Sequence, residues 1–280
     1  MAAAARDLVG RFGVWYRGTP PPELAQALER LGLGTLWLGG SPAGDLRAVE
    51  ELLGATTSLT LATGIVNIWS ADPHDVARAF ARVEAAHPGR FVLGVGVGHP
   101  EATAAYRSPY GSLSAFVETL LADGVPAGRL VLAALGPRVL RLAAERTAGV
   151  HPYLVPVEHT RQAREILGAG PLLAPEQKAV VDLDAARARA RGRDFLGHYL
   201  GLSNYRNNLK RLGWTDADLD DGGSDALIDA LVAHGSAGDV AIRLRAHLDA
   251  GADHVAAHLL AGEDEDRLET FTELARALGR

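Results

Sequence analysis

The sequence predicts an α/β fold, a (β/α)8 TIM barrel, and three observations support this prediction. Eight apolar segments of strand length occur along the 280 residues, and segments of helical periodicity alternate with them. The strand segments are apolar throughout, as expected where helices cover both faces of a parallel sheet. Eight such units match a barrel. A doubly wound sheet is the alternative.

In the first half of the chain, turn residues separate each expected strand from the next helix. The first of these helices has leucines at every third or fourth position and glycines directly after it. A later helix begins with Asp72 as N-cap and Pro73 in its first turn, and ends at Gly89. The expected strands are 11–16, 35–38, 59–68 and the stretch 90–100, and the other expected helices are 23–31 and 46–53.

The second half continues the alternation with four more strands. Ser236, with Asp239 three residues later, predicts a capped helix that ends at Gly251. The expected strands are 130–135, 149–155, 177–182 and 253–260, and the other expected helices are 112–122, 136–146, 158–167 and 264–278.

One region departs from the alternation, because residues 184–234 are polar and helical and contain no expected strand. We therefore expect a single domain, 1–280, with a helical insertion at about 184–235 between the seventh and eighth strands. Long insertions usually have a function or form an interface.

Composition narrows the class of protein. The net charge is −6 and there are no cysteines, which argues against nucleic acid as the main partner and excludes thiolate metal sites and disulfides. No apolar run reaches the length of about 20 residues that spans a membrane, and the N-terminus does not resemble a signal peptide. We expect a cytoplasmic enzyme without a membrane partner.

The stretch Arg90 to Pro100, RFVLGVGVGHP, is the most unusual of the strands. Its glycines, Gly94, Gly96 and Gly98, occupy every second position and therefore share one face. Glycine inside a strand often marks close approach by a ligand or another backbone, so a flat ring can lie there, with His99 at the exit. The alternative is that the glycines only relieve crowding. A dinucleotide fingerprint is not present, because GxGxxG does not occur before a helix here.

In a barrel the active site lies where the strands end. This rule selects a set of candidate positions: Trp15 to Arg17, Gly39 to Ser41, Thr63 to Trp69, Gly98 and His99, Gly136 to Arg138, His151 to Glu158, Asp182 and His258.

Gly136, Pro137 and Arg138 form a candidate anion site. Glycine leaves room, proline presets the first helical turn, and the free N–H groups of that turn favour an anion beside the arginine. The alternative is an ordinary proline-capped helix start. Separately, Thr63 to Asn67 place a glycine and an asparagine within an apolar strand, which indicates a bulge or a strained backbone behind a ring.

Four histidines lie near strand exits: His99, His151, His159 and His258. No two of them have the spacing of an HxH or HxxxH metal pair, so we expect no metal site. His99 is the best general acid or base, because it follows the glycine strand and histidine titrates near neutral pH.

Over nearly its whole length, the chain resembles the luciferase-like (LLM class) flavin and deazaflavin oxidoreductases, and within them the probable F420-dependent oxidoreductases. The resemblance rests on the order of the segments FGVW, LWLGGSP, LATGIVNIW, GRFVLGVGVGH, LAALGPRVLRLAAERTAGVHPYLVPVEHT and HLDAGADHVAAHLL. It implies a (β/α)8 barrel with an insertion before the last strand, and a homodimer.

The resemblance also implies a flavin-type ring in the mouth of the barrel. A bulge with a non-prolyl cis peptide then falls on Thr63, Gly64 and Ile65, with the cis bond between Gly64 and Ile65. The remaining implied contacts are Gly96 to His99 with the ring or cofactor tail, Gly136, Pro137 and Arg138 with phosphate, and Gly39, Gly40, Ser41 and His151 with the cofactor. Trp15, Asn67, Trp69 and His99 line the reacting face, with Asn67 and His99 as catalytic candidates. The segment after His99, AYRSPYGS, is short, which predicts a reduced substrate wall.

Three functions follow from these inferences. The first is an oxidoreductase that transfers a hydride between C5 of coenzyme F420 and a small organic substrate, which the sequence does not identify. The second is an FMN-dependent luciferase-like monooxygenase. The third is a flavin- or deazaflavin-binding protein without turnover.

Overall fold

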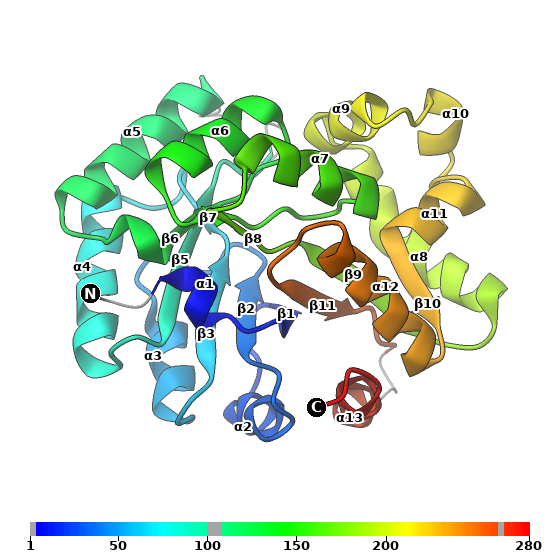
Figure 1. The fold of residues 1–280 in the computed structure, drawn as a ribbon, viewed down its shortest axis with the longest axis horizontal. Helices are drawn as coiled ribbons and strands as arrows, with labels where there is room; N and C mark the ends of the chain where they lie inside the picture. The colour runs from blue at the N-terminus through cyan, green and yellow to red at the C-terminus, as the bar shows by residue number, and fades with distance from the viewer. Residues whose placement is uncertain (1–3, 100–107, 263–265) are drawn as a thin grey trace.

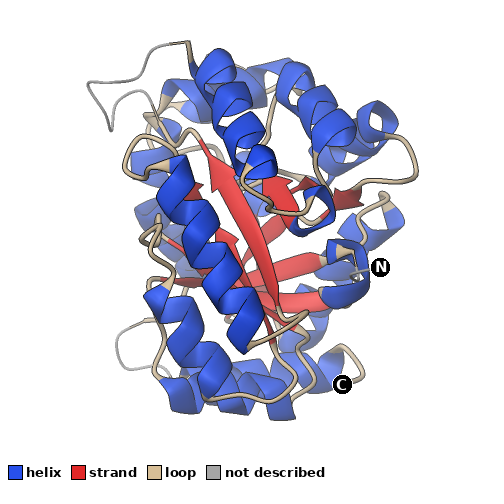
Figure 2. Cartoon of the chain, turned by 90° about the vertical axis from the view of Figure 1, so that its left-hand side faces the viewer, coloured by secondary structure: helices blue, strands red, loops and turns tan. Residues whose placement is uncertain are grey.

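The computed structural model describes residues 4–99, 108–262 and 266–280. Within these ranges the strands form one sheet of eleven strands, whose ladders are parallel. Figure 1 and Figure 2 show the strands at the centre of the molecule and the helices around them. None of the helices within the described ranges has the length and apolar character that crossing a bilayer requires.

The strands are β1 Phe12–Arg17, β2 Thr35–Gly39, β3 Thr60–Gly64, β4 Val66–Asn67, β5 Phe91–Gly96, β6 Leu130–Leu132, β7 Gly149–Val150, β8 Leu172–Leu173, β9 Glu176–Val181, β10 Val232–Gly235 and β11 Val255–Leu259. The helices are α1 Ala5–Leu8, α2 Pro22–Arg30, α3 Arg47–Gly54, α4 Pro73–Ala86, α5 Pro109–Ala122, the 3-10 turn η2 Ala127–Arg129, α6 Pro137–Arg146, α7 Val157–Leu167, α8 Ala185–Leu200, α9 Ser203–Arg211, α10 Asp216–Leu219, α11 Asp225–Leu231, α12 Ala237–Asp249 and α13 Arg267–Ala277.

The sheet closes into a barrel because β8 and β9 are two parts of one extended segment. β8 pairs with β7, whereas β9 pairs with β11, which in turn pairs with β1. Between the two parts, the N–H of Ala256 donates to the carbonyl of Pro175, and the N–H of Glu176 donates to the carbonyl of Pro152. The predicted α/β TIM barrel is therefore confirmed.

Three strand predictions need correction, and the first is that no strand was expected at 172–173, where β8 pairs with β7. Residues 184–234 were expected to contain no strand, yet β10 begins at Val232 and pairs with Lys178 to Val181 of β9. The edge of β9 is free for this pairing because β7 ends at Val150. Val232 and Ala233 are buried, which gives this short strand its apolar contacts. The expected strand 59–68 is divided at Ile65 into β3 and β4, which pair with successive parts of β5.

The predicted helix starts at 23, 46, 136 and 158 lie within one residue of the observed ones, whereas the helix expected from 112 begins at Pro109. Asp72 accepts hydrogen bonds from the N–H groups of His74 and Asp75 at the start of α4, and Ser236 forms a reciprocal capping box with Asp239 at the start of α12. The predicted start of the last helix, at 264, lies outside the described residues, and α13 begins at Arg267.

The insertion forms its own apolar cluster on one side of the barrel. In Figure 1, α8 to α11 lie together beside the sheet, in yellow-green to orange. Leu196, Leu209 and Ile228 are buried there together with Leu154 and Val180 of the barrel. Because these contacts fix the insertion against the ends of the strands, its helices border the mouth of the barrel.

Candidate functional site

A cavity of about 370 Å³ lies where the strands end. Its volume is within the range of about 300–1,000 Å³ that small-molecule sites have. The lining comes from strand exits and from the insertion: Trp15, Gly40, Ser41, Gly64, Ile65, Val97, Gly98, His99, Ala133, Ala134, Leu135, Gly136, Val139, His151, Tyr153, Tyr199, Asn204, Tyr205, Asn207 and Arg211. The predicted position of the site, at the C-terminal ends of the strands, therefore coincides with this cavity.

Gly64 forms the floor of the cavity, and its peptide bond to Ile65 is cis, as predicted. A Cβ atom added at Gly64 would lie 2.9 Å from Nε1 of Trp15 and 3.0 Å from Nε2 of His151. Both ring nitrogens are buried and have no hydrogen-bond partner among the described residues. Glycine at this position therefore leaves open the space that the two nitrogens face.

His151 has a defined tautomer at this floor. Its Nδ1 lies 2.7 Å from the carbonyl oxygen of Ala174, so Nδ1 must be the protonated nitrogen that donates. Burial lowers the pKa of His151 to about 4, although this hydrogen bond and the charge of Glu176 act in the opposite direction. The ring is therefore neutral at pH 7 and presents Nε2 to the cavity as an acceptor.

The glycines of β5 do not face open space, because neighbouring backbone and side chains fill the positions that their side chains would occupy. A Cβ at Gly94 would overlap the carbonyl oxygen of Thr63, and one at Gly96 would meet Ala133 at 2.7 Å and Ile65 at 3.1 Å. Gly96 thus lies behind Ile65, which itself lines the cavity. Thr63 is fully buried and its hydroxyl bonds to the backbone of Gly94, so it fastens β3 to β5.

Asn67 and Trp69 support the loop after β5. The Oδ1 of Asn67 accepts from the N–H of Trp69, and the indole of Trp69 donates to the carbonyl of Val97 at 2.8 Å. A Cβ at Gly98, whose φ is +59°, would meet Nδ2 of Asn67 at 2.8 Å. Neither side chain is among those that line the cavity, although Val97 and Gly98 are.

The exit of β2 makes room for the indole of Trp15. A Cβ at Gly39 would overlap this ring. Gly40 and Ser41 follow with positive φ and line the cavity, whereas Gly39 does not. These three predicted cofactor positions therefore have different surroundings, one behind Trp15 and two at the wall.

His99 lines the cavity opposite aromatic rings from the insertion. Its ring centroid lies 5.2 Å from that of Tyr205 and 6.3 Å from that of Tyr199. Burial raises the pKa of Tyr205 well above its usual value, so this phenol is neutral. Residues 100–107, directly after His99, lie outside the described residues, and the rest of AYRSPYGS, residues 108–112, forms the N-cap and first turn of α5. The predicted reduction of the substrate wall therefore stays a prediction.

The predicted anion turn lies at the rim, but its nearest described cation is not the predicted one. Gly136 is the N-cap of α6 and lines the cavity, and Pro137 is in the first turn. Arg138 is exposed and lies over the ring of Tyr110 at 4.4 Å. Instead, a guanidinium nitrogen of Arg211 lies 3.5 Å from the position of a Cβ on Gly136.

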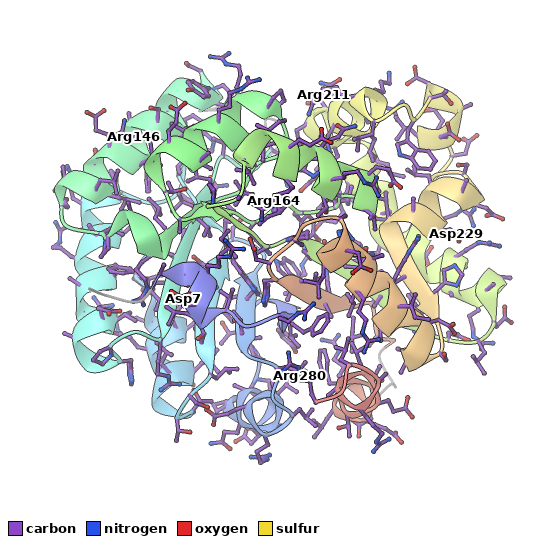
Figure 3. All side chains as sticks on the ribbon, viewed as in Figure 1. Asp7, Arg146, Arg164, Arg211, Asp229 and Arg280 are labelled. Atoms are coloured by element: carbon purple, nitrogen blue, oxygen red, sulfur yellow. The ribbon has the colours of Figure 1, made fainter. Side chains whose placement is uncertain are left out.

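Arg211 is the only Asp, Glu, Lys or Arg among the described residues that line the cavity. It comes from α9, and Figure 3 labels it at the side of the insertion that is nearest α6 and α7. It donates to Oδ1 of Asn208, and no carboxylate of the described residues forms an ion pair with it. Partial burial lowers the pKa of this guanidinium. Within the part of the chain that the structure describes, the rim therefore has a positive charge that no carboxylate balances.

A second group of buried polar residues lies beneath the wall. Glu176 forms an ion pair with Lys178 at 2.8 Å, and Nδ1 of His258 lies 2.9 Å from the same carboxylate. The ring of His258 is 4.2 Å from that of Trp15 and borders a smaller cavity of about 140 Å³ beside Arg17. Glu176 and Lys178 therefore back the site without lining the larger cavity.

His159 holds the anion turn from behind. Its Nε2 donates to the carbonyl oxygen of Leu135 at 2.9 Å, and burial lowers its pKa to about 4. Of the four histidines near strand exits, the structure thus places His99 and His151 at the larger cavity, His258 at the smaller one and His159 behind the turn.

Residues 20–122 match the family model described as luciferase-like monooxygenase. This match confirms the resemblance over that segment. No curated protein matches the chain. Among solved structures, the chain is similar to an F420-dependent secondary alcohol dehydrogenase in complex with an F420-acetone adduct, at 14% identity and a TM-score of 0.74, over 96% of this chain and 99% of that one. The chain has the luciferase-like fold.

Two further structures with the luciferase-like fold differ in cofactor. One is the coenzyme F420-dependent tetrahydromethanopterin reductase from Methanopyrus kandleri, at 14% identity and a TM-score of 0.69, over 96% of this chain and 98% of that one. The other is the oxygenating constituent of 3,6-diketocamphane monooxygenase from Pseudomonas putida in complex with FMN, at 15% identity and a TM-score of 0.66, over 96% and 98%. At such identities the likeness shows the fold alone.

Sequence reasoning missed the wall that the insertion provides. Tyr199, Tyr205 and Arg211 all lie in the segment predicted only as a polar helical excursion. One signal was available, because polar residues at 204, 207, 208 and 211 share a face of α9 at helical spacing. That face turns toward the cavity at Asn204, Asn207 and Arg211.

Proposed function

We propose that this protein is an F420-dependent oxidoreductase that transfers a hydride between C5 of the deazaflavin and a small organic substrate. The observation that supports it most is the cavity floor, where Gly64 leaves open the space faced by Trp15 Nε1 and His151 Nε2. Two buried ring nitrogens that no described residue bonds to, at the end of a barrel, fit a polar ring system better than a purely apolar ligand. The sequence resemblance to probable F420-dependent oxidoreductases agrees with this proposal.

The described residues also fit the rest of such a cofactor. Ile65, Val97 and Ala133 offer apolar surface to a flat ring, and Gly136 leaves space at the start of α6 beside Arg211. A phosphate on the cofactor tail would find there the free N–H groups of a helix start and a guanidinium. The proposed cofactor contacts are therefore Gly40, Ser41, Gly64, Ile65, Gly98, Gly136 and His151 at the lining, with Gly39, Thr63 and Gly96 behind it.

When bound, the deazaflavin would supply the hydride chemistry. The chain would hold the ring against Gly64 and Ile65, and the tyrosines of the insertion would exclude water from its open side. His99, which lies beside Tyr205, is the proposed proton donor or acceptor for the substrate. Asn67 would contribute indirectly, because it does not line the cavity but contacts Gly98 and so positions the loop that does.

An FMN-dependent monooxygenase is the second candidate. The match of residues 20–122 to the luciferase-like monooxygenase model favours it, as does the likeness to an FMN-bound structure. The two candidates differ in the reaction of the reduced cofactor with oxygen, which is fast for flavin and slow for deazaflavin.

Titration of the purified apo protein with F420 and, separately, with FMN tests the proposal, with fluorescence or calorimetry as the readout. Tight binding of F420 with weak binding of FMN is the expected result. A preference for FMN would overturn the F420-dependent function and favour the FMN-dependent monooxygenase. Binding of neither would overturn both candidates. Turnover assays then distinguish an enzyme from a protein that binds the cofactor without catalysis. The homodimer stays a prediction.

A further inference from the structure

Two nitrogens at the floor of the larger cavity are buried and have no partner among the residues that the structure describes. Trp15 is 4% exposed and His151 is 1% exposed. Neither Trp15 Nε1 nor His151 Nε2 has a hydrogen bond among the described residues, and both lie within about 3 Å of one point above Gly64. Buried polar atoms are nearly always paired, so two that face the same space point to a ligand.

The hydrogen-bonding roles of these two atoms are fixed. An indole nitrogen can only donate, and His151 Nε2 can only accept because Nδ1 donates to the carbonyl of Ala174. A matching ligand therefore needs an acceptor beside a donor. A fully ionised phosphate offers only acceptors and an ammonium offers only donors, so neither matches both atoms.

Both rings are held rigidly in place. The indole of Trp15 occupies the space that a side chain at position 39 would fill. His151 stacks on Trp37 with 3.9 Å between ring centroids and an angle of 7° between planes, and Ala174 fixes its rotation. Trp37 is in turn bonded through Nε1 to His254. The donor and the acceptor are therefore preorganised before any ligand binds.

We propose that Trp15 and His151 recognise the imide edge of the flavin-type ring, with Trp15 donating to a pyrimidine carbonyl and His151 accepting the N3–H. This inference rests on the proposed flavin-type cofactor, but it is independent of the choice between F420 and FMN, because both have the same imide edge. It assigns to His151 a role in recognition and leaves proton transfer to another group.

A chemical change on the ligand tests this without altering the protein. The wild-type protein is titrated with the deazaflavin chromophore of F420 and with its N3-methyl derivative, and FMN and N3-methyl FMN form a parallel pair. Methylation removes the donor and leaves His151 Nε2 unpaired, so we expect the affinity for whichever ring binds to fall about tenfold or more.

Three variants complete the test. In His151→Phe, which keeps a stacked ring on Trp37, the methylated and unmethylated rings should bind within about twofold of each other, because the acceptor is absent. In Trp15→Phe the methylated and the unmethylated ring should both bind more weakly. The ratio of their affinities, which we call the N3 discrimination, should stay as in the wild-type protein. His159→Phe is the matched control, because His159 is also a buried histidine bonded to a backbone carbonyl but does not line the cavity. It should keep the full N3 discrimination.

The outcomes separate this inference from the proposed function. Strong N3 discrimination that disappears only in His151→Phe supports it. If the wild-type protein binds a ring equally well with and without the methyl group, the imide inference is overturned while the flavin-type cofactor stands. If no ring binds at all, the proposed cofactor is wrong and the inference fails with it.

Discussion

Nζ of Lys178 lies 2.8 Å from Oε2 of Glu176, and neither side chain has any exposed surface. The two residues are neighbours on one face of β9, and Glu176 also bonds to His258 and to the N–H of Leu154. Burial alone would raise the pKa of Glu176, but Lys178 and His258 lower it to about 2. The carboxylate is therefore ionised at neutral pH and depends on Lys178 for its charge balance.

Replacing Lys178 with Met should destabilise the fold strongly, because it leaves the buried carboxylate without its partner. We expect the free energy of unfolding to fall by about 3–5 kcal/mol at pH 7, measured by urea denaturation. Lys210→Met is the control, because Lys210 forms an ion pair with Asp216 at the surface and should cost no more than about 1 kcal/mol. Equal losses in the two variants would contradict this account.

Acid should destabilise the protein well above the pH at which carboxylates titrate. Burial lowers the pKa of five histidines: His151, His159 and His254 to about 4, His247 to about 3, and His258 below its usual value. In the unfolded chain a histidine titrates near 6.5. Below that pH the histidines are protonated in the unfolded state but stay neutral in the folded state. The stability present above pH 6.5 is therefore lost as the pH falls toward 4.

The slope of stability against pH measures this effect. Each buried histidine contributes up to about 1.4 kcal/mol per pH unit between pH 6 and pH 5, as urea denaturation at several pH values can show. His247→Gln should lower the stability at pH 7.5 and reduce the slope. His198→Gln changes an exposed histidine and should leave the slope as it is. A flat profile between pH 7 and pH 5 would refute the role of the buried histidines.

Gly64→Ala should close the cavity floor. The added Cβ would lie 2.9 Å from Trp15 Nε1 and 3.0 Å from His151 Nε2, so one of the rings must shift. We expect overpacking to cost about 1–3 kcal/mol of stability and the affinity for the ring cofactor to fall at least about tenfold. Gly54→Ala is the control, because nothing lies within 4 Å of its added Cβ. Unchanged cofactor binding in Gly64→Ala would exclude the floor as the ring site.

The barrel could be predicted because local patterns determine it. Buried strands read as apolar runs, and caps such as Asp72 and Ser236 mark helix starts without reference to the rest of the chain. The cis bond after Gly64 was expected from the family resemblance and is present. The short strand β10 was missed because its hydrogen bonds depend on the free edge of β9, which is not a local property.

The site was predicted less completely than the fold. Strand exits could be located from the sequence, and Trp15, Gly64, His99, Gly136 and His151 indeed line the larger cavity. The wall from α8 and α9 could not be located, because its position depends on contacts between the insertion and residues far away in sequence. Charged residues inside an apolar strand were a usable signal for a buried ion pair, because Glu176 and Lys178 are two positions apart and share one face of β9.

The position of Arg211 predicts which arginine recognises a phosphate on the cofactor. The sequence alone points to Arg138, which follows Gly136 directly, but that side chain is exposed and lies on Tyr110. Arg211 lies beside Gly136 at the cavity and has no carboxylate partner among the described residues. A charge-assisted hydrogen bond contributes about 1.5–3 kcal/mol. Arg211→Ala should therefore weaken binding of F420 or FMN about ten- to a hundredfold.

The corresponding ligands without phosphate make this prediction specific. Arg211→Ala should bind the phosphate-free deazaflavin chromophore, or riboflavin, about as well as the wild-type protein does, because only the phosphate contact is lost. Arg138→Ala should bind all of these ligands within about twofold of wild type. Arg206→Ala is a second control from the same helix, since Arg206 forms ion pairs with Asp216 and Asp220. If Arg138→Ala loses affinity only for the phosphorylated ligands and Arg211→Ala does not, the anion lies over the exposed start of α6, outside the cavity rim.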